Sequence, residues 1–246
     1  MDDDQLLRYS RQIMLPEVDV AGQEKLRSAS ALVVGLGGLG SPVALYLAAA
    51  GVGKLVLADD DVVELSNLQR QIVHANAALG QAKAASAKAS VAAINPGVEV
   101  EAIAERIDGP GLEPLLDRVD LVVDATDNFA TRFALNEACW RSGTPLVSGA
   151  AIRWEGQLAV FDPRDAASPC YRCLYADGGG EALNCAENGV IAPLVGVVGA
   201  MQAMEAVKLI TGVGDPLTGR VLYYDAKRGE WRAFKLSRRP GCPTCG

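Results

Sequence analysis

The stretch Ala31-Leu32-Val33-Val34-Gly35-Leu36-Gly37-Gly38-Leu39-Gly40-Ser41-Pro42 decides the fold. It begins with a short apolar run, typical of a buried strand, and Ser41-Pro42 then opens a predicted helix that continues through Ala50. Between them the glycines fit the pattern Gly-x-Gly-x-x-Gly. This pattern permits a tight turn and lets a phosphate approach the backbone at the helix N-terminus. The stretch therefore predicts a strand, a nucleotide-binding loop and a helix in direct succession.

Strands and helices go on alternating up to about residue 150. We expect strands at residues 54–58, 98–104, 120–125 and 145–148, and helices at 81–94, 112–116 and 128–142. Such alternation is typical of an α/β fold with a doubly wound, Rossmann-like and mostly parallel sheet. The pattern indicates one domain over residues 1–246, with a helical segment at 1–28, a nucleotide-binding core at 29–150 and a third region at 151–246.

The third region departs from this alternation. Residues 156–161 and 221–224 are predicted strands that extend the sheet in antiparallel fashion. Residues 192–211 form a long apolar helix with small residues at Gly196, Gly199 and Ala203. Small residues permit close approach of a second element, either within the core or across a dimer interface, and the sequence leaves both alternatives open.

Composition and charge exclude several classes of protein. The net charge is −7 and Lys and Arg form no run, which argues against nucleic acid as the main partner. Residues 29–53 carry no charge, but six glycines interrupt them, so we do not interpret them as a membrane span. The start Met1-Asp2-Asp3-Asp4 is acidic, unlike a secretory signal. We therefore expect a cytoplasmic protein.

Two Cys-x-x-Cys pairs, Cys170/Cys173 and Cys242/Cys245, offer the four thiolates of a closed tetrahedral zinc site. In a reducing compartment such pairs indicate metal or redox chemistry more often than disulfides, and a thioredoxin-like dithiol needs only one pair. Four unrelated buried cysteines are the alternative. With four protein ligands no position stays open for substrate, so the expected zinc is structural.

The remaining cysteines differ in their surroundings. Cys139 lies on a predicted helix and is expected in the core. Cys185 follows the Gly-rich stretch 177–180, which predicts a loop.

The charged residues that follow the glycine loop in sequence help to decide between NAD and a nucleoside triphosphate as the ligand. Asp59 follows the loop by about 20 residues, where an acid can accept hydrogen bonds from ribose hydroxyls, and loop and acid alone suggest NAD. Arg70 and Lys83, however, add cations, and Asp127 ends a predicted strand. Several cations plus an acid able to hold magnesium fit a triphosphate better. The alternatives are an NAD-dependent oxidoreductase and, for each cation alone, a solvated surface residue.

Several motifs occur together and in order along essentially the whole chain. They are Arg8-Tyr9-x-Arg11-Gln12, the glycine loop, Asp59-x-Asp61, Ser66-Asn67-Leu68-Gln69-Arg70-Gln71, Gly80-Gln81-x-Lys83, Asp127-Asn128-x-x-x-Arg132 and the two cysteine pairs. In this combination the chain resembles the bacterial MoeB/ThiF adenylyltransferases, relatives of the ubiquitin-activating enzymes. The glycine loop alone would not be specific, whereas the ordered set is.

The resemblance implies a homodimer that binds ATP with magnesium and adenylates the C-terminal carboxylate of a small ubiquitin-like sulfur-carrier protein ending in Gly-Gly, releasing pyrophosphate. A separate protein would donate the sulfur. The molybdopterin pathway is favoured, and thiamin-thiazole or specialised thiocarboxylate pathways stay open. Residues 151–246 would then bind the carrier and hold the zinc.

The resemblance also implies roles for individual residues. ATP would be bound by Gly35, Gly37, Gly38, Gly40, Asp59, Asp61, Ser66, Asn67, Leu68, Gln69, Arg70, Lys83, Asp127 and Asn128. Asp127 would hold magnesium and contribute to catalysis with Arg70, Lys83 and, from the neighbouring subunit, Arg11. Cys185 would be a candidate nucleophile that becomes linked to the carrier. The only histidine, His74, is expected to be structural or at the surface.

Overall fold

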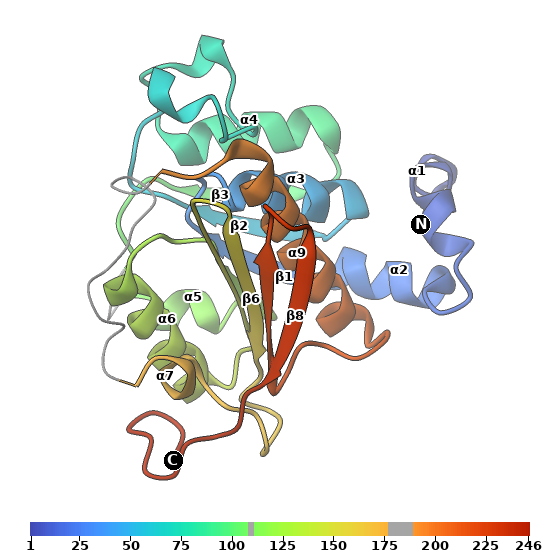
Figure 1. Ribbon diagram of the computed structural model, residues 1–246. Coiled ribbons are helices and arrows are strands. Elements are labelled where there is room, and N and C mark those ends of the chain that lie inside the picture. Colours follow the sequence, from blue (N-terminus) through green and yellow to red (C-terminus); the bar gives the residue numbers. More distant parts are fainter. Residues whose placement is uncertain (108–110, 177–188) are drawn as a thin grey trace.

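The computed structural model describes residues 1–107, 111–176 and 189–246 (Figure 1). Over these residues the chain forms one eight-stranded sheet with the order β3-β2-β1-β4-β5-β6-β7-β8. The strands are β1 (Ser30–Val34), β2 (Lys54–Ala58), β3 (Glu99–Ile103), β4 (Leu121–Asp124), β5 (Leu146–Ile152), β6 (Glu155–Phe161), β7 (Arg220–Asp225) and β8 (Glu230–Lys235). The predicted doubly wound α/β fold with an antiparallel extension is confirmed.

The parallel half of the sheet reverses its winding at β1. From β1 the chain moves outward through β2 to β3, and it then returns to place β4 on the other side of β1. Strand β5 pairs in parallel with β4. In open sheets of this kind, ligands bind at the carboxyl ends of the strands where the winding reverses. The ends of β1 and β4 are therefore where a binding site is expected.

The antiparallel half is longer than the sequence predicts. Strand β5 continues to Ile152 and turns into β6 through Arg153, which has a φ of 51°. Strand β8 (Glu230–Lys235) was not predicted. All six of its residues are exposed, and three of them are charged. Charged and apolar residues alternate from Glu230 to Ala233, a signal that the sequence analysis missed. It forms by pairing with β7.

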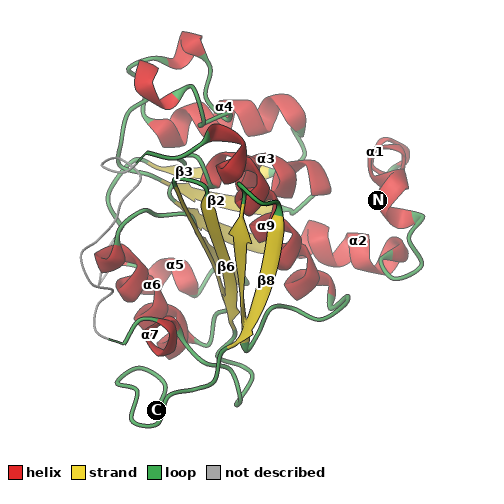
Figure 2. Cartoon of the chain, viewed as in Figure 1, coloured by secondary structure: helices red, strands yellow, loops and turns green. Residues whose placement is uncertain are grey.

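Helices cover both faces of the sheet (Figure 2). The described helices are α1 (Asp3–Ile13), α2 (Asp19–Ser28), α3 (Gly40–Ala50), α4 (Lys83–Ile94), α5 (Glu113–Leu116), α6 (Phe129–Ser142), α7 (Tyr171–Leu174) and α9 (Ala192–Thr211), with short 3-10 turns η1 (Leu65–Asn67) and η2 (Asn76–Ala78). Along β1, Ala31 and Val33 join the apolar cluster under α3, α4 and α9, while Leu32 and Val34 join the cluster under α5, α6 and α7. This alternation buries β1 on both faces.

Helix α9 belongs to the core. It is long and apolar enough to cross a membrane, but half of its most apolar window is buried inside the protein. It packs on α3 and on the strands β5 and β6. A side chain at Gly199 would overlap the Leu39 carbonyl and come within 2.5 Å of Pro42, so this glycine allows close contact between α9 and α3. Of the two alternatives for the small residues, core packing applies to Gly199 and to the buried Ala203.

The N-terminal helical segment consists of two helices, because the chain turns between Ile13 and Asp19 around Pro16. Tyr9, Arg8 and Gln12 attach helix α1 to the rest of the molecule. The Asn95 side chain donates a hydrogen bond to the Tyr9 hydroxyl at 2.8 Å, and both residues are buried.

The glycine loop joins β1 to α3, and its backbone packs closely against itself and against the segment after β4. Gly35 has a φ of +89°, a backbone conformation that residues other than glycine rarely adopt. A Cβ on Gly40 would overlap the Gly35 carbonyl oxygen. A Cβ on Gly37 would instead meet only the Gln71 side-chain nitrogen, at 3.6 Å. The loop thus has no room for a side chain at Gly40 but has room for a Cβ at Gly37.

This contrast predicts different costs for two alanine substitutions. Gly40→Ala should lower the free energy of unfolding by about 2–3 kcal/mol, because the backbone of the loop must move. Gly37→Ala should change it by less than about 1 kcal/mol. Urea-induced unfolding of both variants measures the difference, and equal losses of stability would contradict this account of the loop.

Candidate functional site

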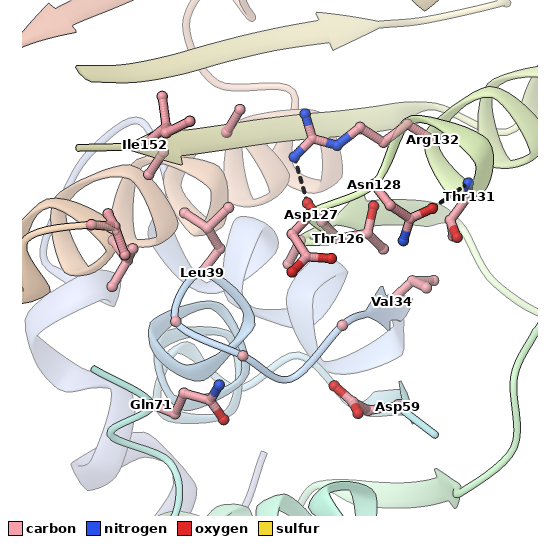
Figure 3. Close-up of a pocket in the computed structure, with 18 of the residues that line it drawn as sticks. Val34, Leu39, Asp59, Gln71, Thr126, Asp127, Asn128, Thr131, Arg132 and Ile152 are labelled. Atoms are coloured by element: carbon pink, nitrogen blue, oxygen red, sulfur yellow. Dashed lines mark hydrogen bonds between the residues drawn. The ribbon is translucent and has the colours of Figure 1, made fainter. Parts of the chain in front are cut away.

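A cavity of about 440 Å³ lies at the carboxyl ends of β1 and β4 (Figure 3). The glycine loop forms one wall, and the segment from Thr126 to Asn128 forms another. Residues of β5, β6 and β7 close its far end. The volume is in the range of small-molecule binding pockets. The cavity therefore occupies the position at which the reversal of the sheet predicts a ligand.

Two side chains, Asp59 and His74, fix the glycine loop by bonding to the backbone of Leu36. The Leu36 amide donates to Asp59 Oδ2 at 2.6 Å, which ties the loop to the end of β2. The Leu36 carbonyl lies 3.0 Å from Nε2 of the buried His74, and Nδ1 of this ring lies 2.9 Å from Ser86 Oγ. Because a carbonyl only accepts, Nε2 carries the proton. Burial lowers the pKa of His74, so the imidazole stays neutral and has a structural role, as the sequence predicted.

Lys83 presents a buried ammonium group between two acids. Its Nζ lies 2.8 Å from Asp61 Oδ2 and 3.9 Å from Asp59 Oδ1. Burial raises the pKa of Asp59, and the charge of Lys83 acts against this rise. Lys83 is only 5% exposed and lines the cavity. The two acids thus hold a cation at the cavity wall, where it can meet the negative charge of a phosphate.

Arg70 places a second cation at the cavity. It follows the short turn η1, and its Nη1 donates to the Ser66 carbonyl at 3.1 Å. Asn67 shapes this turn, since its Oδ1 accepts a hydrogen bond from the Glu64 amide at 3.1 Å.

The structure brings most of the residues singled out in the sequence to the cavity. Those that line it are Gly35, Gly37, Gly38, Asp59, Asp61, Arg70, Lys83, Asp127 and Asn128. Gly40, Ser66, Asn67, Leu68 and Gln69 do not line it, although they belong to the segments that do. Gln71 lines it instead, with its Oε1 buried and without a hydrogen-bond partner.

Asp127 lies shortly after the end of β4, with its side chain exposed at the cavity. The next residue, Asn128, caps helix α6, because its Oδ1 accepts a hydrogen bond from the Thr131 amide at 2.9 Å. The cap fixes the start of α6 immediately after Asp127.

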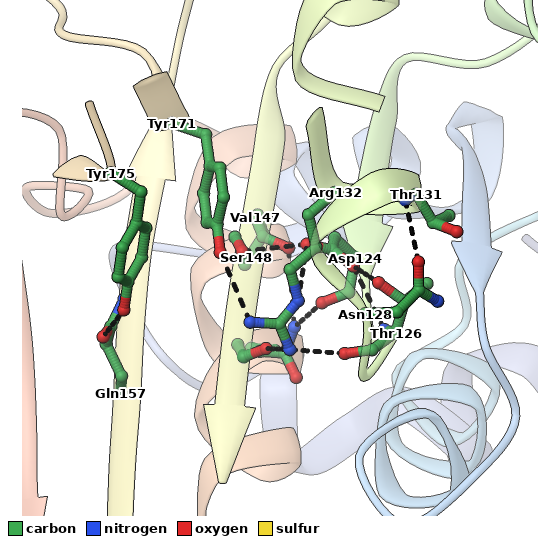
Figure 4. Close-up of polar contacts among 12 residues, drawn as sticks. Asp124, Thr126, Asn128, Thr131, Arg132, Val147, Ser148, Gln157, Tyr171 and Tyr175 are labelled. Carbon is green, nitrogen blue, oxygen red and sulfur yellow. Dashed lines mark hydrogen bonds and ion pairs between the residues drawn. The ribbon is translucent and has the colours of Figure 1, made fainter. Parts of the chain in front are cut away.

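Beneath this segment lies a buried polar network around Asp124 (Figure 4). Asp124 is fully buried at the end of β4, and its Oδ1 accepts from the amide and hydroxyl of Thr126 at 3.1 and 2.7 Å. Its Oδ2 accepts from Ser148 Oγ at 2.9 Å. The sequence analysis missed Asp124. The available signal was an acid closing the apolar run of a buried strand.

Aromatic and polar side chains from α6, β6 and β7 and from the residue after α7 form a second part of the lining, here called the aromatic lobe. Tyr175 donates a hydrogen bond to Gln157 Oε1 at 2.6 Å, and Phe129 packs edge-on against Tyr175. Tyr223 completes the lobe, and burial raises its pKa to about 12. Sequence reasoning did not find these residues, which lie far apart in the chain. The lining of the cavity thus includes the glycine loop, Asp127 and the aromatic lobe.

The two cysteine pairs meet beside α7, near the C-terminus (Figure 1). Cys170 Sγ lies 3.6 Å from Cys242 Sγ, and Cys173 Sγ lies 3.4 Å from Cys245 Sγ. All four sulfur atoms lie within 4.8 Å of one another. Zinc–sulfur bonds of about 2.3 Å in a tetrahedron place sulfurs about 3.8 Å apart. The cluster therefore fits a zinc ion and rules out four unrelated cysteines.

Three other residues from the sequence analysis either lie away from the cavity or lie outside the residues that the structure describes. Arg11 is exposed on α1 and does not line the cavity within this chain. Cys185 and the Gly-rich stretch 177–180 lie outside the described residues. Cys139 is buried on α6, and burial raises the pKa of its thiol, as expected for a core cysteine.

Comparisons with known proteins match this fold and site. The ThiF family model covers residues 9–244. The chain is 49% identical over 246 residues to a molybdopterin-synthase adenylyltransferase of Escherichia coli (strain K12), covering all of this chain and 98% of that protein. It is 45% identical to the sulfur carrier protein ThiS adenylyltransferase of the same organism, covering all of this chain and 97% of that protein.

A solved structure of Escherichia coli MccB with ATP is similar with a TM-score of 0.84 and 26% identity, over 97% of this chain and 74% of that one. The family model and these two relatives extend over essentially the whole chain, and the fold agrees with that of the solved structure. The chain therefore belongs to the ThiF family and is an adenylyltransferase.

Proposed function

We propose that this adenylyltransferase activates the C-terminal glycine carboxylate of a small ubiquitin-like sulfur-carrier protein in molybdopterin cofactor biosynthesis. The observation that carries the proposal is one cavity whose lining combines the glycine loop, the cations Arg70 and Lys83, Asp127 and a group of aromatic side chains. The loop-lined part suits a nucleotide, and the lobe suits a second, extended substrate. The relative with 49% identity, a molybdopterin-synthase adenylyltransferase, supports this pathway.

In this proposal the loop-lined part binds ATP. Gly35, Gly37 and Gly38 let the triphosphate approach the backbone, and Asp59 accepts hydrogen bonds from the ribose. Lys83 and Arg70 neutralise phosphate charge. Asp127, with Asn128 beside it, would hold magnesium, an ion that prefers carboxylate ligands together with substrate phosphates.

The reaction needs no general base from the protein. A C-terminal carboxylate has a pKa of about 3.3–3.7, so it is ionised near neutral pH. Its oxygen attacks the α-phosphorus of ATP, the bond from this phosphorus to the bridging oxygen breaks, and pyrophosphate leaves. The chain must therefore align two anions and reduce their repulsion. The neutral, buried His74 is consistent with chemistry of this kind.

The partners follow from the same proposal. The carrier ends in Gly-Gly, the sulfur donor is a separate protein, and the enzyme acts as a cytoplasmic homodimer in which Arg11 reaches the triphosphate of the neighbouring subunit. Cys185 remains a candidate for a covalent link to the carrier. The relative with 45% identity acts on the sulfur carrier protein ThiS, so the thiamin-thiazole pathway is the second candidate. The NAD-dependent oxidoreductase is set aside, since the chain is an adenylyltransferase.

We further propose that the four cysteines hold a structural zinc ion. The ligands lie 72 positions apart in sequence, and closing such a long loop restricts the unfolded chain. The ion would tie the C-terminal residues to the start of α7.

The assignment of Asp127 is tested by carrier-dependent ATP–pyrophosphate exchange. Asp127→Asn should lower the rate at least about 100-fold, because the carboxylate that would hold magnesium against the reacting phosphates is lost. Asp117→Asn, which changes an exposed acid outside the cavity, serves as the matched control. Exchange at the wild-type rate in Asp127→Asn would refute the role of Asp127. Running the assay with a molybdopterin-type and a thiazole-type carrier identifies the pathway.

The zinc proposal is tested by replacing one ligand. Cys245→Ser should reduce the zinc content well below one ion per chain and lower Tm by roughly 10 °C, because the long loop is no longer closed. Cys139→Ala removes a buried thiol outside the cluster and should keep its zinc. Metal analysis and thermal unfolding measure both effects. Unchanged stability in Cys245→Ser, together with lost exchange activity, would contradict a structural role.

A further inference from the structure

Arg132 is a buried cation in the cavity wall whose partners are chiefly uncharged oxygen atoms (Figure 4). It is 8% exposed, and its Nη2 donates to the Thr126 carbonyl and, at 3.3 Å, to the Gly149 carbonyl. Its Nη1 donates to the Tyr171 hydroxyl at 3.4 Å. The nearest acid, Asp124, lies 4.0 Å from Nε. A planar guanidinium can hold several oxygens at once in fixed directions.

The Thr126 carbonyl belongs to the peptide bond that leads into Asp127. Asp124 accepts hydrogen bonds from the amide and hydroxyl of the same threonine. Thr126 is thus held on both sides, at its amide by Asp124 and at its carbonyl by Arg132. Asp127 itself has an exposed side chain, so the direction of its carboxylate depends on the backbone that carries it. Fixing this peptide limits where the carboxylate can point.

Tyr171 holds the guanidinium from the other side. It is 1% exposed, and its ring packs edge-on against Phe133 and Phe161. Its backbone amide donates to Asn136 Oδ1 at 2.7 Å, which docks α7 on α6. The hydroxyl therefore has a fixed place in the core. This residue directly follows Cys170, so a segment far from the glycine loop in sequence contributes to the nucleotide site.

We propose that Arg132 and Tyr171 are positioning residues for adenylation. Arg132 fixes the Thr126–Asp127 peptide, and Tyr171 fixes the guanidinium of Arg132. The inference rests on the proposed function, since it assigns Asp127 the role given above. A stabilising core contact alone would affect folding without separating turnover from nucleotide binding.

Two variants test this inference in the full-length protein. Tyr171→Phe removes one hydroxyl and keeps the ring, and Arg132→Lys keeps the positive charge but not the planar fork. Tyr46→Phe, on the exposed face of α3, is the control. With carrier-dependent ATP–pyrophosphate exchange as the assay, Tyr171→Phe should lower kcat by about 5–10-fold, and Arg132→Lys by roughly 100-fold. The KM for ATP should stay within about twofold in both.

Hydrogen exchange supplies a second measurement that does not depend on catalysis. The amides of residues 125–128 should exchange faster in both variants than in the wild type and in Tyr46→Phe, because the Thr126–Asp127 peptide is less restrained. If Arg132→Lys fails to fold, Tyr171→Phe decides alone.

Two results would overturn the inference. One is a lower Tm in Tyr171→Phe with an unchanged kcat at a temperature where the protein stays folded. The other is unchanged protection of residues 125–128, whatever the activity assay shows. A wild-type protein without exchange activity for any carrier would contradict the proposed function, and hydrogen exchange would still decide on the positioning role.

Discussion

The adjacency of β1 and β4 is the constraint on which the site depends. These strands are distant in sequence, yet their register sets Val34 beside Asp124, so that the glycine loop and the Asp127 segment leave the sheet at neighbouring points. Each wall of the cavity begins where one of the two strands ends. Because both strands are buried on both faces, a shift of one against the other would disrupt the apolar clusters above and below the sheet. The packing of the core therefore also fixes the geometry of the site.

The two buried cations at the site have partners within the protein before any substrate arrives. Lys83 is held by Asp59 and Asp61, while Arg132 relies mainly on carbonyl and hydroxyl oxygens. A buried charge without such partners would cost several kcal/mol. The two cations differ in consequence. Lys83 can share its charge with a phosphate that enters the cavity, whereas the fork of Arg132 is engaged with the backbone around it.

Local signals in the sequence predicted the parallel half of the fold. The glycine loop, the strand at 54–58 and the helix at 192–211 each have a pattern within one segment, and the structure places them where that pattern indicates. Strand β8 has only a short alternation of charged and apolar residues, from Glu230 to Ala233, and its place in the sheet is set by pairing with β7. No local pattern marks the aromatic lobe or the contacts of Arg132 with Tyr171. They bring together residues from separate elements, which spacing along the chain does not reveal. The spacing of the cysteines, in contrast, predicted a four-cysteine cluster correctly. Two Cys-x-x-Cys pairs in one chain are typical of a metal site and of few other structures.

Strand β8 has a consequence for the behaviour of the protein in solution. It is the last strand of the sheet, so one row of its backbone groups lies at an edge. An edge of this kind can recruit a strand from another molecule and start aggregation. Glu230, Arg232 and Lys235 place charges along β8, and pairing with a second chain would crowd or desolvate them. These three charges thus help to keep the protein from associating edge to edge.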